Sequence, residues 1–250
     1  IDNSIDEFVM GHGKKIDLFV EGQKVTVRDY GRGIPLGKVL DCVSKINTGG
    51  KYDSKVFKKS VGLNGVGSKA VNALSAWFKI QSVRDGKKKV AEYKQGEIIN
   101  DFPEENTKEP NGTLVEFIPD ETIFENYNYL EEFLEKLVWN YVYLNSGLVV
   151  NFNGKRFYSK KGLYDLLSNK TNMEQIVYPI IHLKGEDIEM AITHNNHYGE
   201  EYYTFVNGQF TPQGGTHLAA FKESFVRTIR DFLKKNYDAA DIKTSIIAAV

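Results

Sequence analysis

A carboxylate followed by a glycine turn is the segment of this sequence best suited to binding a ligand. Residues 29–35 are Asp-Tyr-Gly-Arg-Gly-Ile-Pro, and they follow an alternating strand pattern at 24–28. Asp29 is therefore expected at a strand end, where Gly31 and Gly33 allow close approach of the backbone. A buried carboxylate needs donors, because burying a polar group without a partner costs roughly 2 to 7 kcal/mol. The amino group of a planar base would serve, and an ordinary surface turn is the alternative.

A glycine-rich stretch at 62–69, Gly-Leu-Asn-Gly-Val-Gly-Ser-Lys, is the second feature that could bind a ligand. Glycines ahead of a helix offer backbone N–H groups to an anion, and phosphate is the natural guest. Two other phosphate loops fit poorly. A P-loop has Lys before Ser or Thr, whereas Ser68 precedes Lys69 here, and a dinucleotide fingerprint should follow a strand directly. A purely structural turn is the remaining alternative.

The periodicity of apolar residues predicts the elements that position these motifs. Residues 1–11 form an amphipathic helix, with Asn3, Asp6 and Glu7 on a polar face. A hairpin follows at 16–28. Further expected elements are helices over 36–46 and 66–76, strands at 78–83, 89–93 and 113–118, and a polar surface loop over 101–111.

The second half of the chain begins with its strongest helical stripe, which runs from Leu130 to Val142 and predicts a helix packed on a core. The pattern turns polar around 169–175, which is the candidate domain boundary. Beyond it we expect strands at 180–183, 188–193 and 202–206, and a helix over 217–233.

Composition excludes several classes of protein. With 250 residues, 41% of them hydrophobic, the chain has room for one large domain or two moderate ones. The net charge of -1 lacks the basic excess of a stand-alone nucleic-acid module. The single Cys42 excludes an internal disulfide, and with no apolar run of about 18 residues and no signal peptide it favours the cytoplasm. The scattered histidines predict no structural zinc site.

Taken in order, four features resemble the Bergerat-fold (GHKL) ATPases: a polar helix face, Asp29 with its glycine turn, a glycine-rich stretch, and Asn-Gly-Thr at 111–113 opening a strand. This superfamily includes the B subunits of DNA gyrase and topoisomerase IV, the MutL proteins, heat-shock chaperones and sensor kinases. The chain most strongly resembles the type II topoisomerase B subunits. The motifs that carry this resemblance lie at 1–7, 29–35, 48–53, 62–67, 71–75, 144–147 and 213–218.

The resemblance implies the α+β class, with a Bergerat α/β sandwich over 1–173 followed over 174–250 by the N-terminal part of a ribosomal-protein-S5-like transducer domain. It also implies ATP and Mg²⁺ as cofactors. Asn3 would coordinate the Mg²⁺, which takes oxygen ligands. Asp29 would accept the adenine amino hydrogen, and Thr113 would assist it directly or through water.

Other residues are implied to surround the nucleotide. Ile34 and Pro35 would form part of the adenine wall, and Lys51 would lie in the lid. Arg32 and Arg84 would border the pocket, where aminocoumarin-type inhibitors of the family also bind. The full implied set is Asn3, Asp6, Glu7, Asp29, Arg32, Gly33, Ile34, Pro35, Lys51, Gly62, Leu63, Asn64, Gly65, Val66, Gly67, Ser68, Arg84 and Thr113, of which 62–68 would wrap the phosphates with main-chain N–H groups.

No catalytic residue is expected within the chain. The family's general base is a Glu that would stand two residues before Ile1, and the Gln-Thr-Lys loop that contacts the γ-phosphate would follow Val250. The N-terminal arm that closes the ATP-dependent homodimer is expected outside the chain too. Because a general base contributes about 10² to 10⁴ in rate, the chain should bind ATP far better than it hydrolyses it.

The implied function is the ATPase region of a bacterial type II topoisomerase B subunit, in which ATP-driven dimer closure captures DNA for strand passage. The partner would be the A-type subunit, which carries the cleavage tyrosine. Two features favour topoisomerase IV over gyrase. Asn64 stands where gyrase B usually has His, and the segment after Pro35 is short. The alternatives are a gyrase B subunit, a MutL-like or chaperone ATPase clamp, and a non-hydrolysing nucleotide-binding module.

Overall fold

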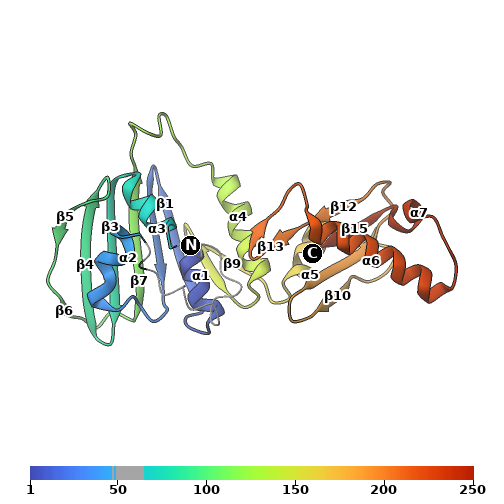
Figure 1. Cartoon of the computed structure of the whole chain (residues 1–250), viewed down its shortest axis with the longest axis horizontal. Coiled ribbons are helices and arrows are strands. Elements are labelled where there is room, and N and C mark those ends of the chain that lie inside the picture. The colour runs from blue at the N-terminus through green and yellow to red at the C-terminus, as the bar shows by residue number, and fades with distance from the viewer. Residues whose placement is uncertain (47, 49–64) are drawn as a thin grey trace. The chain divides into compact units, whose positions relative to one another are not determined.

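The computed structural model describes residues 1–46, 48 and 65–250. They form two compact units, Ile1–Tyr158 and Ser159–Val250 (Figure 1). Lys51 and residues 62–64, which the sequence placed at the site, lie outside the described residues. Among the helices that the structure describes, none is long and apolar enough to cross a membrane.

A nine-stranded sheet forms the framework of the first unit. Its strand order is β5-β4-β3-β7-β2-β1-β8-β9, and β6 pairs with β4 beside β5. All pairs are antiparallel except β1 with β8. The strands are β1 (Lys15–Glu21), β2 (Lys24–Asp29), β3 (Ser75–Arg84), β4 (Lys87–Lys94), β5 (Glu97–Asp101), β6 (Glu105–Asn106), β7 (Gly112–Pro119), β8 (Val149–Phe152) and β9 (Lys155–Tyr158).

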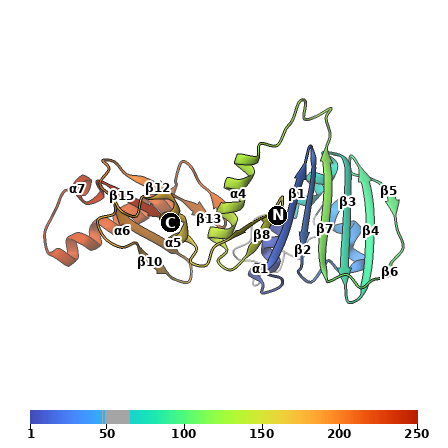
Figure 2. The ribbon, with the colours of Figure 1, turned by 180° about the vertical axis from the view of Figure 1, so that it is seen from behind.

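Helices cover one face of this sheet. They are α1 (Asp2–Val9), the 3-10 turn η1 (Leu36–Lys38), α2 (Val39–Ser44), α3 (Gly67–Ala73) and α4 (Glu131–Leu144). Figure 1 shows α1, α2 and α3 on the near side of the strands, and Figure 2 shows the strands from their other face. Every helix predicted for 1–158 is present, although the one expected over 36–46 begins as η1.

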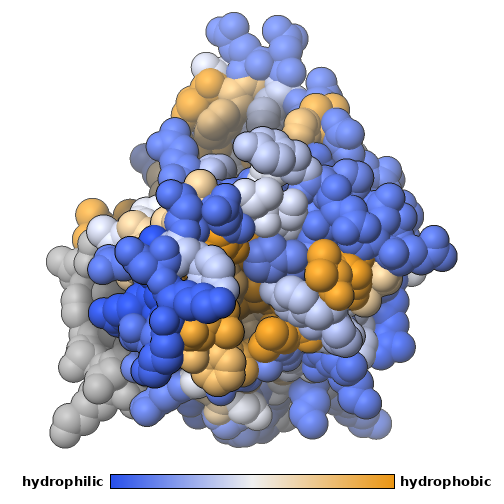
Figure 3. Space-filling model, turned by 90° about the vertical axis from the view of Figure 1, so that its right-hand side faces the viewer, coloured by the Kyte–Doolittle hydropathy of each residue, from blue (hydrophilic) through white to orange (hydrophobic). Residues whose placement is uncertain are grey.

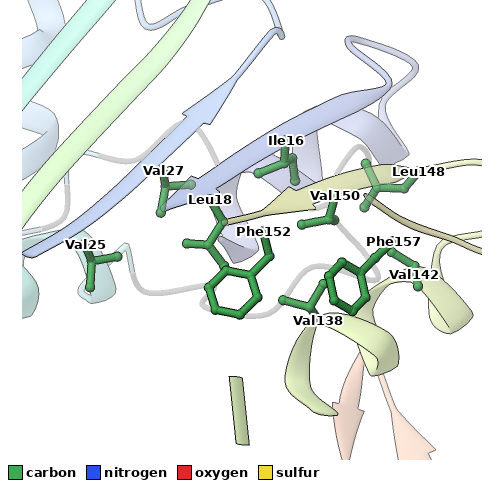
Figure 4. Packing of buried hydrophobic residues seen from close by; sticks show 10 residues of the cluster. All are labelled: Ile16, Leu18, Val25, Val27, Val138, Val142, Leu148, Val150, Phe152 and Phe157. Carbon is green, nitrogen blue, oxygen red and sulfur yellow. The ribbon is translucent and has the colours of Figure 1, made fainter. Parts of the chain in front are cut away.

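Two hydrophobic clusters fill the space between helices and sheet. In the first, Ile16 and Leu18 of β1 alternate with outward polar positions and meet α4 and β8 (Figure 4). The second contains Val39 of α2 and Phe78 of β3, and Phe117 packs against both clusters. Burying one such side chain stabilises the fold by roughly 1.5 to 3 kcal/mol. The clusters fix α1, α2 and α3 over the inner face of the sheet.

The apolar stripe on α4 is buried only in part. Val138 and Val142 are buried, whereas Leu130, Phe133 and Leu137 are 55%, 57% and 43% exposed. The prediction that the whole stripe packs on a core is therefore wrong for its N-terminal half. Helical spacing identifies an apolar face, but the partner elements β8 and β9 cover only part of that face.

The polar loop predicted over 101–111 is also partly wrong. β5 ends at Asp101, and β6 lies within the predicted loop. Lys88 and Lys89 pair with Glu105 and Asp101 across these strands. Pairing of backbone groups at a sheet edge does not require apolar side chains, so the alternation rule gave no signal for these strands.

The second unit contains a four-stranded sheet of order β10-β11-β15-β12 and the ribbon β13-β14. Helix α6 packs on the sheet through Phe221, which lies in a cluster with Ile192 and Ile246. Its elements are α5 (Leu163–Lys170), β10 (Ile181–Lys184), β11 (Glu189–His194), β12 (Glu201–Tyr203), β13 (Phe205–Val206), β14 (Gln209–Phe210), α6 (Thr216–Leu233), α7 (Ala239–Lys243) and β15 (Ile246–Ala249).

The division of the chain differs from the expected boundary after residue 173. Helix α5 contacts β11 and β15, so it belongs to the second unit. Its local sequence carries no sign of this, because Leu163, Leu166 and Leu167 are buried in a manner typical of a helix in either unit.

From the side drawn in Figure 3, the surface is mainly hydrophilic, with hydrophobic residues in separate patches.

A cluster of charged side chains around Glu200 joins α6 and α7 within the second unit and makes the stability of this unit depend on pH. The carboxylate accepts hydrogen bonds from Lys222 of α6 (2.9 Å), Lys243 of α7 (3.0 Å) and the Tyr202 hydroxyl (2.9 Å). Burial opposes ionisation, but these partners lower the pKa of Glu200 to about 2. The stabilisation is therefore complete above the ordinary glutamate pKa and is lost as pH falls toward about 2.

Glu200→Gln is accordingly expected to lower the melting temperature at pH 7, with a deficit that shrinks as the pH falls from about 5 to about 3. Calorimetric scans of both proteins across this range would measure the difference. A deficit that stays constant over the range would show that the ion pairs contribute nothing to it.

Candidate functional site

The Asp29 carboxylate is buried where β2 ends, with only 6% of the residue exposed. Its Oδ1 accepts the main-chain N–H groups of Gly31 (3.0 Å) and Thr113 (3.1 Å), and its Oδ2 accepts the Ser4 hydroxyl (3.3 Å). Three segments distant in sequence thus converge on one carboxylate. This burial is incompatible with an ordinary surface turn.

Burial raises the pKa of Asp29, although the N–H groups of Gly31 and Thr113 act in the opposite direction. An ionised carboxylate offers about four acceptor positions, and the three bonds above leave room for one more donor. A buried acceptor in this state discriminates strongly in favour of a ligand that carries an N–H group at that position. Asp29 therefore has the chemistry of a recognition group for an amino or amide hydrogen.

Strand register brings further polar groups beside Asp29. Thr113 of β7 pairs with Ser82 of β3, and the neighbouring pair Arg28–Leu114 places Thr113 next to Asp29. The Ser82 hydroxyl donates to the main-chain oxygen of Ile34 at 2.7 Å, which ties the turn to the sheet. Sequence reasoning missed both Ser4 and Ser82. Ser82 had a local signal, because it continues the inward alternation of Phe78 and Ile80.

Two glycines at the site have no room for a side chain. A Cβ on Gly33 would lie 2.3 Å from the Val83 main-chain oxygen, and one on Gly112 would lie 2.2 Å from that of Asp29. Both residues also have positive φ, +75° and +136°. The segment that follows Asp29 therefore contacts β3 at Gly33, and β7 contacts Asp29 at Gly112. Both contacts are too close for a side chain.

Glu7 and Arg32 form a multidentate ion pair beside the turn. Glu7 Oε2 accepts the Arg32 main-chain N–H (2.9 Å) and Nε–H (3.1 Å), and Oε1 accepts Nη2–H (2.8 Å). Burial opposes ionisation of Glu7, but the bonds from Arg32 hold its pKa below the ordinary value. Arg84 reaches the same turn through a bond from Nη1 to the Gly33 oxygen (3.4 Å). The bonds between Glu7 and Arg32 thereby hold helix α1 against the turn that follows Asp29.

The other predicted residues differ in their exposure and in their hydrogen bonds. Asn3 is exposed on α1, next to the buried Ser4. Ser68 directs its hydroxyl to the Cys42 oxygen of α2 (3.1 Å) and not toward open space. Val66 precedes α3 and makes no side-chain cap bond. Within the described ranges there is no group of three or more His, Cys, Asp or Glu side chains that could hold a metal ion.

Comparisons with known proteins agree on one family. A family model described as DNA gyrase B matches residues 130–248. The chain is 48% identical over all its residues to the DNA topoisomerase 4 B subunit of Borreliella burgdorferi, covering 42% of that protein. It is 32% identical over its whole length to the DNA gyrase B subunit of Campylobacter jejuni, covering 36% of it. The chain thus spans about two fifths of the length of these relatives.

Solved structures show the same fold. The 43K ATPase domain of Thermus thermophilus gyrase B, in complex with an aminocoumarin, superposes on 99% of the chain with a TM-score of 0.77 and 25% identity, over 72% of its own length. The ATPase region of Saccharomyces cerevisiae topoisomerase II has a TM-score of 0.80 at 22% identity, and 69% of it is covered. The predicted α+β Bergerat fold is confirmed. The chain belongs to the family of type II DNA topoisomerase B subunits.

Proposed function

We propose that this chain is the ATP-binding region of a bacterial topoisomerase IV B subunit, in which nucleotide binding drives dimer closure during DNA strand passage. The observation that carries the proposal is the Asp29 carboxylate, which is buried, held by three protein donors and left with one acceptor position. The adenine ring offers a matching donor in its exocyclic amino group. Family membership supplies the reason to place ATP there.

The remaining parts of the nucleotide site follow from the same placement. Thr113 holds Asp29 through its main-chain N–H, and the Ser82 hydroxyl holds the turn through the Ile34 main-chain oxygen. We place Ile34 and Pro35 in the wall against the base. Asn3 offers the amide oxygen for Mg²⁺, and residues 65–68 offer main-chain N–H groups to the phosphates. Bound Mg²⁺ would neutralise phosphate charge. Arg32 and Arg84 border the pocket, where we place aminocoumarin-type inhibitors.

The choice of topoisomerase IV over gyrase rests on sequence identity. The Borreliella burgdorferi topoisomerase 4 protein is 48% identical over the whole chain, whereas the gyrase protein of Campylobacter jejuni is 32% identical. A gyrase B subunit is the second candidate, because other topoisomerase 4 relatives, such as that of Enterococcus faecalis at 27%, are no more similar than gyrases. Partners in either case would be an A-type subunit and DNA, in the cytoplasm.

Strand passage by the complete enzyme tests this choice. The full-length protein, combined with its A-type partner, is expected to separate interlinked DNA circles when ATP is present and to introduce no negative supercoils. The two activities are measured by gel electrophoresis of interlinked and relaxed circular DNA. ATP-dependent supercoiling would assign the chain to gyrase, and failure in both assays would favour a different ATPase clamp.

A further inference from the structure

The dipeptide Asn-Gly occurs four times in the sequence, and three of the four lie in the described part of the chain. These three begin at Asn111, Asn153 and Asn207, whereas Asn64 lies outside the described residues. Asparagine is a thermolabile residue. Because glycine has no Cβ, little obstructs an approach of its main-chain nitrogen to the asparagine side chain before it. The surroundings of each asparagine therefore decide whether its amide is chemically stable.

The fold holds the amides of Asn111 and Asn153. Asn111 Oδ1 accepts the main-chain N–H of Asp85 at 2.9 Å. Asn153 Oδ1 accepts the main-chain N–H of Val20 at 2.9 Å, and its Nδ2 donates to the main-chain oxygen of Val20 at 3.1 Å. Both asparagines adjoin strands of the nine-stranded sheet. Neither side chain can turn toward the glycine that follows it without losing these bonds.

Asn207 has a similar backbone conformation but no such bonds. With Gly208 it forms the two-residue turn between β13 and β14. The φ angles of this pair are +48° and +84°, close to the +46° and +82° of Asn153 and Gly154. The Asn207 side chain is exposed, and the described residues give it no hydrogen-bond partner. The same turn chemistry thus occurs once with a fixed amide and once with a free one.

The β13–β14 ribbon is also easier to open than the β8–β9 hairpin. It has two residue pairs, Phe205 with Phe210 and Val206 with Gln209, whereas β8 and β9 have four pairs and β8 also pairs with β1. Val206 and Phe210 are 44% and 48% exposed. Segments with few buried contacts open at a low cost in free energy, and segments within a sheet open rarely. The turn at Asn207 is therefore the described Asn-Gly turn that opens most often.

We propose that Asn207 is a site of spontaneous deamidation, which converts the turn between β13 and β14 to isoaspartate or aspartate. In the opened turn, the main-chain nitrogen of Gly208 loses its proton to solvent and attacks Cγ of Asn207. A succinimide ring forms as the Cγ–Nδ2 bond breaks, and ammonia leaves with a proton from solvent. Water then opens the ring. Cleavage between the nitrogen and the main-chain carbonyl carbon gives isoaspartate, and cleavage between the nitrogen and Cγ gives aspartate, so one water is consumed for each ammonia released.

Isoaspartate changes the turn in two ways. It adds a carboxylate where Asn207 is neutral, and it lengthens the main chain by one carbon. A two-residue hairpin loop requires a specific backbone geometry, so the pair between Val206 and Gln209 should be lost. The base of the ribbon is held separately, because the Thr204 hydroxyl donates to the Thr211 oxygen at 2.6 Å and accepts the Thr211 hydroxyl at 2.8 Å. The change should therefore stay confined to the tip of the ribbon.

The test is peptide mapping by mass spectrometry after the folded wild-type chain has been incubated in mildly alkaline buffer. The peptide that contains Asn207 is expected to gain the mass of an amide-to-acid conversion and to separate into an isoaspartate and an aspartate form. This should occur at least about tenfold faster than at Asn111 or Asn153, because those two sites react only when the sheet opens. In guanidinium chloride, where the fold no longer protects them, the three sites should react at similar rates.

Asn207→Gln is the matched variant, because it keeps an amide but moves it one carbon away from the attacking nitrogen. The folded variant should lose the rapid release of ammonia that the wild-type chain shows. Three results would overturn the assignment: an Asn207 rate in the folded chain no higher than that of Asn153, aspartate without isoaspartate as the product, or unchanged ammonia release in Asn207→Gln.

Discussion

Replacing Asp29 with asparagine is expected to abolish measurable ATP binding and to leave the fold intact. The amide can satisfy the protein's own groups, since its oxygen can accept the N–H groups of Gly31 and Thr113 and its NH₂ can donate to the Ser4 hydroxyl. Toward the adenine amino group, however, it presents a donor in place of an acceptor. Two buried donors would face each other unpaired, so affinity should fall at least about 100-fold. Titration calorimetry with ATP measures this loss.

The same substitution should stabilise the protein at neutral pH. Burial raises the pKa of Asp29, so the folded state binds its proton more tightly than the unfolded chain. Ionised Asp29 therefore lowers the free energy of unfolding, and does so increasingly as pH rises from about 4 through the raised pKa. Asparagine removes this effect. The gain in melting temperature should be largest at neutral pH and vanish below about pH 4.

Asp17→Asn is the matched control for Asp29→Asn. Burial opposes ionisation of Asp17 too, but hydrogen bonds from Tyr30, Asn151 and Lys15 lower its pKa below the ordinary value. Its replacement should cost stability at neutral pH and leave ATP affinity unchanged. Unaltered ATP binding in Asp29→Asn would contradict the adenine assignment, and a loss of stability there at pH 7 would contradict the pKa argument.

The elements at the site could be predicted from the sequence because their signals are local. The alternation of Ile16 and Leu18, and of Val25 and Val27, identified β1, β2 and the strand end at Asp29. What covers Asp29 could not be predicted in this way. Thr113 lies 84 residues further along the chain and Ser4 lies 25 residues earlier. Only the assembled sheet and α1 bring them together, so local pattern left a surface turn equally acceptable.

The errors in the predicted fold have the same cause, because they too depend on contacts between distant segments. The exposure of the N-terminal half of the α4 stripe depends on which elements lie alongside it, and so does the formation of the exposed edge strands β5 and β6. The neighbours of an element are a tertiary property, and one sequence does not display them.

Gly33→Ala is expected to have the second large effect, because the turn is packed against β3 without room for a methyl group. The added Cβ would lie 2.3 Å from the Val83 main-chain oxygen, at a φ of +75° that disfavours alanine. Backbone strain of this kind costs about 1 to 3 kcal/mol, and the turn must also shift away from the strand. We expect the free energy of unfolding to fall by about 3 kcal/mol or more, with ATP affinity lost as Asp29 moves.

Gly154→Ala separates the two causes of this loss. Gly154 has a similar φ of +82° but no heavy atom within 4 Å of the added Cβ. It should therefore show the cost of conformation alone, about 1 kcal/mol, with ATP binding retained. Urea unfolding of both variants measures the two free energies, and their difference is the cost of the contact with Val83. If the two variants lost equal stability and both bound ATP, strand β3 would be able to move away from the turn, and the tight packing argued for this site would be wrong.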